Sequence, residues 1–136
     1  MSRVVYKTGT QFEEVYPHCK AVLVDKTLYV AGTGGVNYQT GEWPLGAAEQ
    51  TRLALDNLKE ILAKFRLTFK DIVRCEVIYT SADVWSTAMP LIAERFRGVD
   101  STHIAFCAGL PVPEMLIEFQ VTAWSPSAEL VPAVKE

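Results

Sequence analysis

Residues 115–124 carry two kinds of side chain in alternation. In an extended chain, one face would hold the apolar set Ile117, Phe119, Val121 and Ala123, and the other would hold Leu116, Glu118, Gln120 and Thr122. A strand with this pattern borders a hydrophobic core on one side only. The chain therefore contains a sheet with one buried face, and Glu118 stands on the opposite face, where an oligomer could bury it.

Other segments rich in β-branched and aromatic residues predict the rest of this sheet. They are residues 4–7, 21–24, 27–31, 72–80 and 103–108. Asp25 and Lys26 separate the second and third segments, which is typical of a β-hairpin.

Two segments have the periodicity of amphipathic helices. The first covers residues 46–66, and the second runs from an N-cap at Ser81 to about residue 97. The expected apolar faces are Leu55, Leu58, Leu62 and Phe65 in the first helix and Trp85, Met89, Ile92 and Phe96 in the second. Pro90 predicts a kink in the second helix or a later start.

Two helices are too few to surround such a sheet. We therefore expect an α+β fold in which a mixed β-sheet has both helices packed on one face. The other face must meet water or another subunit. Residues 1–124 are expected to form a single domain, and residues 125–136 a C-terminal tail.

Size and charge exclude several classes of protein. The chain has 136 residues, of which 49% are hydrophobic, and 13 Lys and Arg against 16 Asp and Glu give a net charge of −3. This apolar content excludes a mainly disordered chain. Without a run of Lys or Arg, nucleic acid is not an expected partner. No segment approaches the ~20 apolar residues of a membrane span, and the N-terminus lacks the apolar core of a signal peptide, so we expect no membrane partner and a cytoplasmic location.

The cysteines and histidines do not predict a metal site. Cys19, Cys75 and Cys107 are odd in number and lack C-x-x-C spacing, so we expect free thiols. With His18 and His103 they also lack the paired spacing of zinc ligands. Cys75 and Cys107 lie in apolar strands and are expected to be unreactive, which leaves Cys19 as the thiol to test. His103 is expected to be structural or interfacial.

The segment Gly32-Thr33-Gly34-Gly35 lacks the G-x-G-x-x-G spacing of a dinucleotide site. It predicts a tight turn whose N–H groups could hold a substrate carboxylate or carbonyl oxygen. Four aromatic residues could line such a pocket, although aromatic residues are more often core or interface: Tyr38, Trp43, Trp85 and Phe106.

A series of short motifs over residues 16–124 resembles the RidA family (YjgF-like, reactive intermediate or enamine/imine deaminases). They are TLYVAG at 27–32, TGE at 40–42, EQTR and ALDNL within 49–58, AERF at 93–96, LP at 110–111 and LIE at 116–118. The resemblance implies a chorismate-mutase-like fold and a homotrimer with ligand clefts between subunits. It also implies hydrolysis, without a cofactor, of small 2-imino or enamine acids to 2-oxo acids and ammonia.

The resemblance also implies an altered pocket. The family arginine that clamps the substrate carboxylate falls at Thr102, or at Asp100 if two residues are inserted. An arginine suits that task because its planar guanidinium offers two parallel donors. The family asparagine of the second helix falls near Met89, and the cysteine that follows the arginine falls at Ile104. The chain therefore resembles a divergent member that lacks the arginine.

Two titratable residues are the predicted catalytic groups. Glu118, which the resemblance retains, would position or activate the hydrolytic water, with an interface salt bridge as the alternative role. His18, at the position of a family tyrosine, would donate a proton to the leaving nitrogen, or else lie on the surface before the second strand.

The favoured function is an enamine/imine deaminase acting on a non-typical small-molecule substrate such as an aminomuconate-like acid. The alternatives are a non-catalytic metabolite-binding or regulatory trimer, and a biosynthetic enzyme that uses the same cleft for condensation or tautomerisation. A ribonuclease role is disfavoured by the net charge of −3. The expected substrate-binding residues are Gly32, Thr33, Gly34, Gly35, Met89, Thr102, Ile104 and Phe106.

Overall fold

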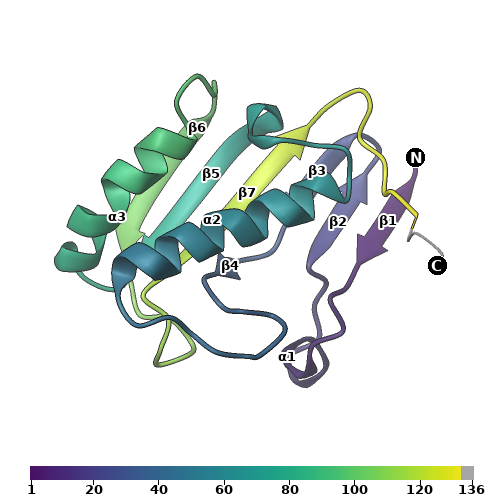
Figure 1. Ribbon diagram of the computed structural model, residues 1–136. Coiled ribbons are helices and arrows are strands. Elements are labelled where there is room, and N and C mark those ends of the chain that lie inside the picture. The colour runs from purple at the N-terminus through teal and green to yellow at the C-terminus, as the bar shows by residue number, and fades with distance from the viewer. Residues whose placement is uncertain (133–136) are drawn as a thin grey trace.

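Seven strands form one mixed sheet in the computed structural model, which describes residues 1–132 (Figure 1). The strands are β1 (Arg3–Tyr6), β2 (Ala21–Val24), β3 (Thr27–Val30), β4 (Thr33–Gly34), β5 (Ile72–Tyr79), β6 (Thr102–Cys107) and β7 (Ile117–Trp124). Their order is β1-β2-β3-β7-β5-β6, and β4 pairs with β7 farther along the edge that β3 occupies. Strands β5 and β6 run parallel, and the other neighbours are antiparallel. The predicted strands are confirmed with small shifts at their ends, whereas β4 was not predicted.

Two long helices, α2 (Ala47–Ala63) and α3 (Ala82–Arg95), lie on the same face of the sheet (Figure 1). The Ser81 side chain accepts a hydrogen bond from the Val84 amide, so the predicted N-cap of α3 is confirmed. Because α3 begins at Ala82 and continues through Pro90, the predicted alternative of a later start is wrong. The structure adds a short helix, α1 (Gln11–Val15), and a 3-10 turn, η1 (Phe69–Asp71). Within residues 1–132, no helix combines the length and apolar character needed to cross a membrane.

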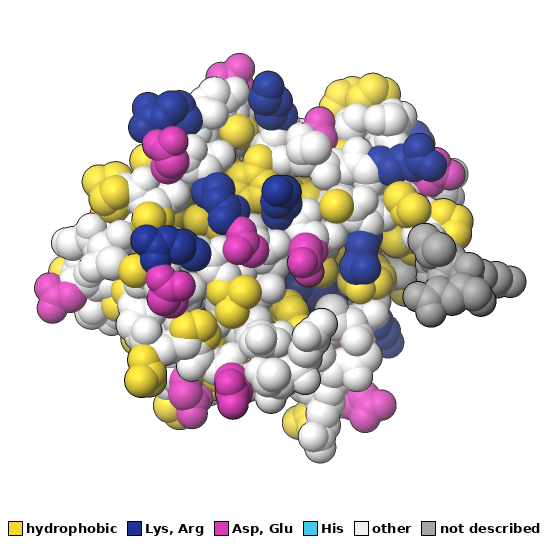
Figure 2. All heavy atoms as spheres, in the orientation of Figure 1, with side chains coloured by type: hydrophobic (Ala, Val, Ile, Leu, Met, Phe, Trp, Pro, Cys, Tyr) yellow, Lys and Arg dark blue, Asp and Glu magenta, His cyan; other side chains and the backbone are white. Residues whose placement is uncertain are grey.

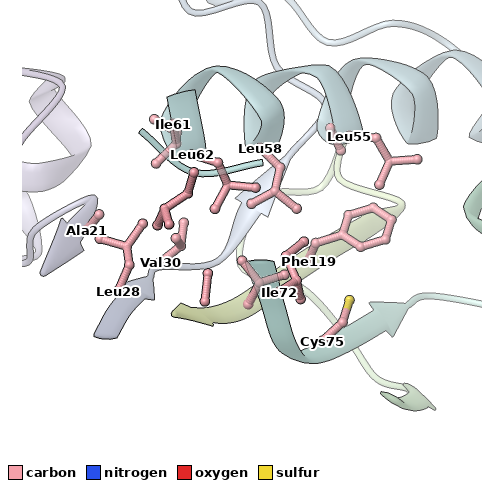
Figure 3. Packing of buried hydrophobic residues seen from close by; sticks show 14 of the residues in the cluster. Ala21, Leu28, Val30, Leu55, Leu58, Ile61, Leu62, Ile72, Cys75 and Phe119 are labelled. Carbon is pink, nitrogen blue, oxygen red and sulfur yellow. The ribbon is translucent and has the colours of Figure 1, made fainter. Parts of the chain in front are cut away.

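The core lies between α2 and the inner face of the sheet. Figure 3 shows Leu55, Leu58 and Leu62 of α2 directed toward Phe119 and Ile72 of the sheet. The predicted apolar face of α2 and the predicted inner set of β7 are all at most 1% exposed: Leu55, Leu58, Leu62, Phe65, Ile117, Phe119, Val121 and Ala123. Both predictions are therefore confirmed.

The predicted apolar face of α3 is confirmed at Ile92 and Phe96, which are buried, and at Trp85, which packs against the core, but not at Met89. Val84, Ala88 and Ile92 are buried, whereas Met89 is exposed. Both series, 84-88-92 and 85-89-92, fit helical spacing. The structure buries the series that contains Val84 and Ala88, and α3 packs against α2. The prediction of Met89 as a core residue is wrong.

Among residues 1–132, no helix covers the other face of the sheet (Figure 1). Its apolar side chains include Val5 of β1, Tyr29 of β3, Trp124 of β7, and Ile104 and Phe106 of β6, which are 41–52% exposed. The strand register places all five on the side opposite α2 and α3. By contrast, the outer surface of the helix layer carries Lys and Arg interspersed with Asp and Glu (Figure 2). The sheet face opposite α2 and α3 also carries the Arg74–Glu76 ion pair. We call this side of the sheet the uncovered face, and its existence confirms the sequence-based expectation.

The predicted C-terminal tail is attached to the end of α2 over its described part. The Glu129 amide donates to the Phe65 carbonyl at 3.1 Å, and the Val131 amide donates to the Lys64 carbonyl at 2.8 Å. Ala128 is buried in the core. Residues 125–132 therefore pack against the domain, and residues 133–136 lie outside the described part of the chain.

Candidate functional site

Three loops enclose a cavity of about 330 Å³ at the end of the sheet where β4 pairs with β7. The residues that line the cavity come from three segments of the chain, 8–20, 32–43 and 111–118. This volume lies at the lower end of the range typical of small-molecule sites. Four predicted site residues line it: Glu118, His18, Gly32 and Gly34.

The Glu118 carboxylate lies directly over Gly32. A Cβ atom on Gly32 would sit 1.8 Å from Glu118 Oε1 and 2.5 Å from its carboxyl carbon. The glycine is therefore required because the carboxylate occupies the space of a side chain. Burial raises the pKa of Glu118 above its usual value, although the nearby charge of Lys20 acts in the opposite direction.

Lys20 lines the same cavity and was missed by the sequence analysis as a site residue. Its side chain is only 5% exposed, and its Nζ donates to the Gly32 carbonyl at 3.1 Å and to Thr33 Oγ1 at 2.9 Å. Burial lowers the pKa of Lys20 to about 8, because a low-dielectric surrounding disfavours the ammonium form. The charge of Glu118 partly offsets this effect.

His18 is half-buried at the cavity wall rather than free on the surface. Its Nδ1 lies 2.6 Å from the Tyr16 carbonyl, and its ring meets the edge of Phe12 at a centroid distance of 5.3 Å. These contacts hold the ring in place beside the cavity. His18 is therefore one of the two predicted catalytic residues that line the cavity.

Glu13 stabilises one wall of the cavity. Its carboxylate accepts hydrogen bonds from the Thr8 amide at 3.1 Å, the Thr8 hydroxyl at 2.8 Å and the Gly9 amide at 3.0 Å. Burial acts to raise the pKa of Glu13, but the hydrogen bonds outweigh it, and the net pKa is lower than usual. Glu13 is therefore a charged group that orders the segment between β1 and α1.

The glycine segment has a different conformation from the one predicted. Thr33 and Gly34 form β4 and pair with Phe119 and Glu118 of β7, so the interpretation as a tight turn is wrong. Thr33 is buried, and its hydroxyl holds Lys20. Gly35 packs against the backbone of α2 and is not among the cavity residues.

In a single subunit, the other predicted substrate-binding residues on β6 and α3 lie away from this cavity. Thr102, Ile104 and Phe106 lie on β6, on the uncovered face, and Met89 lies on the outside of α3. None of the four lines the cavity. A second subunit on the uncovered face would be needed to bring the β6 residues to a ligand.

The three thiols differ in exposure: Cys75 is buried, Cys19 is partly buried and Cys107 is exposed. Cys19, Cys75 and Cys107 are free cysteines. Burial raises the pKa of Cys75 to about 12, which makes this thiol unreactive. Cys107 lies in β6, as predicted, but it is exposed, so burial does not account for its expected lack of reactivity. The His103 ring packs edge-on against Phe96 at 4.6 Å, which supports the structural interpretation.

The buried Lys20 predicts a pH-dependent stability. The pKa of Lys20 is about 8 in the folded protein against an ordinary 10.5, so between these values the folded state binds fewer protons than the unfolded state. The contribution of Lys20 to the free energy of unfolding therefore rises as the pH increases from about 8 to 10.5. Relative to Lys20→Gln, we expect wild type to gain about 3 kcal/mol in free energy of unfolding from pH 8 to pH 10.5. Urea unfolding of both proteins at several pH values measures this gain, and two parallel curves would contradict it.

Comparison with known proteins agrees with the fold and the motifs. The family model described as Endoribonuclease L-PSP matches residues 8–125. The chain belongs to this family. It is the YjgF/RidA family, so the sequence-based assignment is confirmed.

Relatives in the YjgF/RidA family cover most of the chain. The chain is 32% identical over 111 residues to a rat protein and 30% identical over 111 residues to a bovine protein, both named 2-iminobutanoate/2-iminopropanoate deaminase. Each match covers 80% of this chain and 81% of the relative.

Solved structures of the family share the fold. A member of the YjgF/YER057c/UK114 family from Mycobacterium tuberculosis is 26% identical, with a TM-score of 0.77 over 91% of this chain and 100% of that one. A putative endoribonuclease from Thermotoga maritima is 26% identical, with a TM-score of 0.79 over 92% of this chain and 98% of that one. The mixed sheet with helices on one face is therefore the fold of the family.

Proposed function

We propose that the chain hydrolyses an imine or enamine to a carbonyl compound and ammonia in the cavity that contains Glu118. The observation that carries the proposal is the half-buried Glu118 carboxylate, fixed over Gly32 in a cavity of about 330 Å³. The activity named for the rat and bovine relatives supports the same reaction class.

Glu118 supplies the base for this reaction. As a water oxygen attacks the carbon of the C=N bond, the carboxylate accepts a proton from that water. Burial raises the pKa of Glu118, and a higher pKa makes a carboxylate a stronger base near neutral pH. The C=N bond becomes a single bond as the nitrogen takes a proton from His18, the proposed donor at the cavity wall. Glu118 then passes the water proton to the same nitrogen, the carbon–nitrogen bond breaks, and the hydroxyl proton returns to His18 as the carbonyl forms. Ammonia and the carbonyl product are released, and no cofactor takes part.

The cavity walls favour a substrate larger than a simple short-chain imino acid. Tyr38, Trp43 and Met115 line the space, and apolar and aromatic walls select ligands with extended carbon skeletons. We therefore propose an unsaturated amino acid, such as an aminomuconate-like acid, as the substrate class.

A substrate panel tests the proposal. Ammonia release is measured with 2-iminopropanoate, 2-iminobutanoate and an aminomuconate-like acid, and we expect the highest kcat/KM for the last. The preference is wrong if the two short imino acids are turned over faster. Tight binding of these compounds without ammonia release would instead favour the non-catalytic metabolite-binding protein.

We propose a homotrimer that buries the uncovered face. Exposed apolar patches of this kind mark interaction sites, and a second copy would place Thr102, Ile104 and Phe106 beside a neighbour. Light scattering should give three times 15.1 kDa. Ile104→Glu should reduce the mass, because it introduces a charge into the interface. Met89→Glu, at a similarly exposed position on α3, is the control and should leave the mass unchanged. A wild-type monomer at micromolar concentration would contradict the trimer.

A further inference from the structure

We infer that Lys20 is a nucleophile that forms a Schiff base with the carbonyl or imine carbon of a ligand in the cavity. The choice of 2-oxo acids and their imines as the ligand class rests on the proposed function. The covalent role of Lys20 rests on the geometry around its Nζ atom.

The hydrogen bonds of Lys20 match the donors of a neutral amine. The Gly32 carbonyl can only accept, and it receives one N–H of Nζ at 3.1 Å. Thr33 Oγ1 gives its own proton to the Ala31 carbonyl at 2.9 Å, so it must accept the second N–H of Nζ at 2.9 Å. A neutral amine has two N–H groups and one lone pair. The two hydrogen bonds need only two N–H groups, so the neutral amine keeps both of them and has its lone pair available to a ligand in the cavity, whereas the ammonium form makes the same two bonds and has no lone pair.

The amine is close to the cavity and shielded from bulk water. Lys20 is 5% exposed and lines the cavity together with Glu118. The Tyr38 ring stands with its centroid 5.8 Å from Nζ and also lines the space. Within the described part of the chain, Lys20 is the one Lys or Arg that lines the cavity.

Burial supplies the reactive form of the amine. A lysine becomes a nucleophile when desolvation lowers its pKa toward the working pH. The pKa of Lys20 is about 8, so near pH 8 about half of the side chains are neutral. An ordinary lysine at the same pH is almost entirely protonated.

Lys20, Glu118, water and the imine supply every bond and every proton that the covalent reaction needs. On this route Lys20 replaces water as the first nucleophile and replaces His18 as the proton donor to the leaving nitrogen. The Lys20 lone pair attacks the carbon of a protonated imine, and a carbon–nitrogen bond forms. A proton passes from the Lys20 nitrogen to the substrate nitrogen, the original carbon–nitrogen bond breaks, and ammonia leaves. Water then adds to the Schiff base carbon while Glu118 accepts its proton, and Glu118 returns that proton to the Lys20 nitrogen. The carbon–Lys20 bond breaks as the hydroxyl proton passes to the Lys20 nitrogen, which releases the carbonyl compound, and the Lys20 ammonium then gives its extra proton to the released ammonia.

Reductive trapping tests the inference. The full-length protein is incubated at pH 8 with pyruvate, a 2-oxo acid, and sodium cyanoborohydride, and the adduct is located by peptide mass mapping. We expect a stoichiometry approaching one adduct per chain, located at Lys20. Adducts spread over the exposed lysines, with no preference for Lys20, would overturn the inference. Because this measurement uses wild type, it does not depend on the folding of a variant.

Two matched variants sharpen the result. Lys20→Gln keeps an amide donor near the Gly32 carbonyl but has no nucleophilic amine, so the adduct should disappear. Lys59→Gln removes an exposed lysine of α2 and should leave the adduct unchanged. An adduct of equal yield in Lys20→Gln would overturn the inference.

The outcome separates the nucleophile from the proposed function. Ammonia release by wild type without a trapped adduct would remove the Schiff base and leave the deaminase intact. A trapped adduct at Lys20 without ammonia release from any imine would retain the nucleophile and remove the deaminase.

Discussion

Gly32→Ala should reduce deaminase activity by at least about 10²-fold while leaving the protein folded. The new methyl group would lie 1.8 Å from Glu118 Oε1, so the carboxylate must move away from its position. The colliding atom is the end of a flexible side chain, so a new rotamer can accommodate the methyl group at little cost in stability. Loss of a positioned general base costs about 10²–10⁴-fold in rate.

Gly109→Ala is the matched control for this prediction. A Cβ atom on Gly109 would meet nothing within 4 Å, and its backbone does not have a positive φ. This variant should keep wild-type kcat/KM. Wild-type activity in Gly32→Ala would show that the position of Glu118 over Gly32 does not matter for turnover.

Gly35→Ala should destabilise the fold by about 3 kcal/mol or more. A Cβ atom there would lie 2.2 Å from the Gln50 carbonyl oxygen and 2.7 Å from its Cα. These are backbone atoms of α2, so they can move only if the helix moves away from β4. Overpacking of a well-packed core typically costs 1–3 kcal/mol and occasionally more.

The position of α2 at this point is fixed by several contacts, which makes the collision costly. The Gln50 side chain donates to the Pro44 and Glu114 carbonyls and accepts from the Leu116 amide. Urea unfolding measures the effect, with Gly109→Ala again as the control. An unchanged unfolding midpoint in Gly35→Ala would show that the helix yields without cost.

Patterns of side-chain alternation predicted most of the fold. In β7 the period of two assigned Ile117 and Phe119 to the core, because a strand has only two faces. The α3 helix was less well determined, since two overlapping series fit its helical period and packing chose the one without Met89. The α1 helix and β4 escaped prediction because five and two residues are too short to show a period.

The site was only partly predictable, because its parts come from distant segments. Glu118 and Gly32 were found through the family motifs, and the cavity does join them. Lys20 was missed because its burial depends on Gly32 and Thr33, which follow it by twelve and thirteen residues in the chain. The available signal was its place two residues after His18, the position of a family tyrosine.

The deaminase rate of Glu118→Gln tests the central claim most directly. The amide keeps the size of the carboxylate over Gly32 but cannot accept the proton of the attacking water. We expect kcat/KM for the best imine substrate to fall by at least about 10²-fold. Glu60→Gln, on the exposed side of α2, is the control and should keep the wild-type value. Equal rates of ammonia release from wild type and Glu118→Gln would contradict the account.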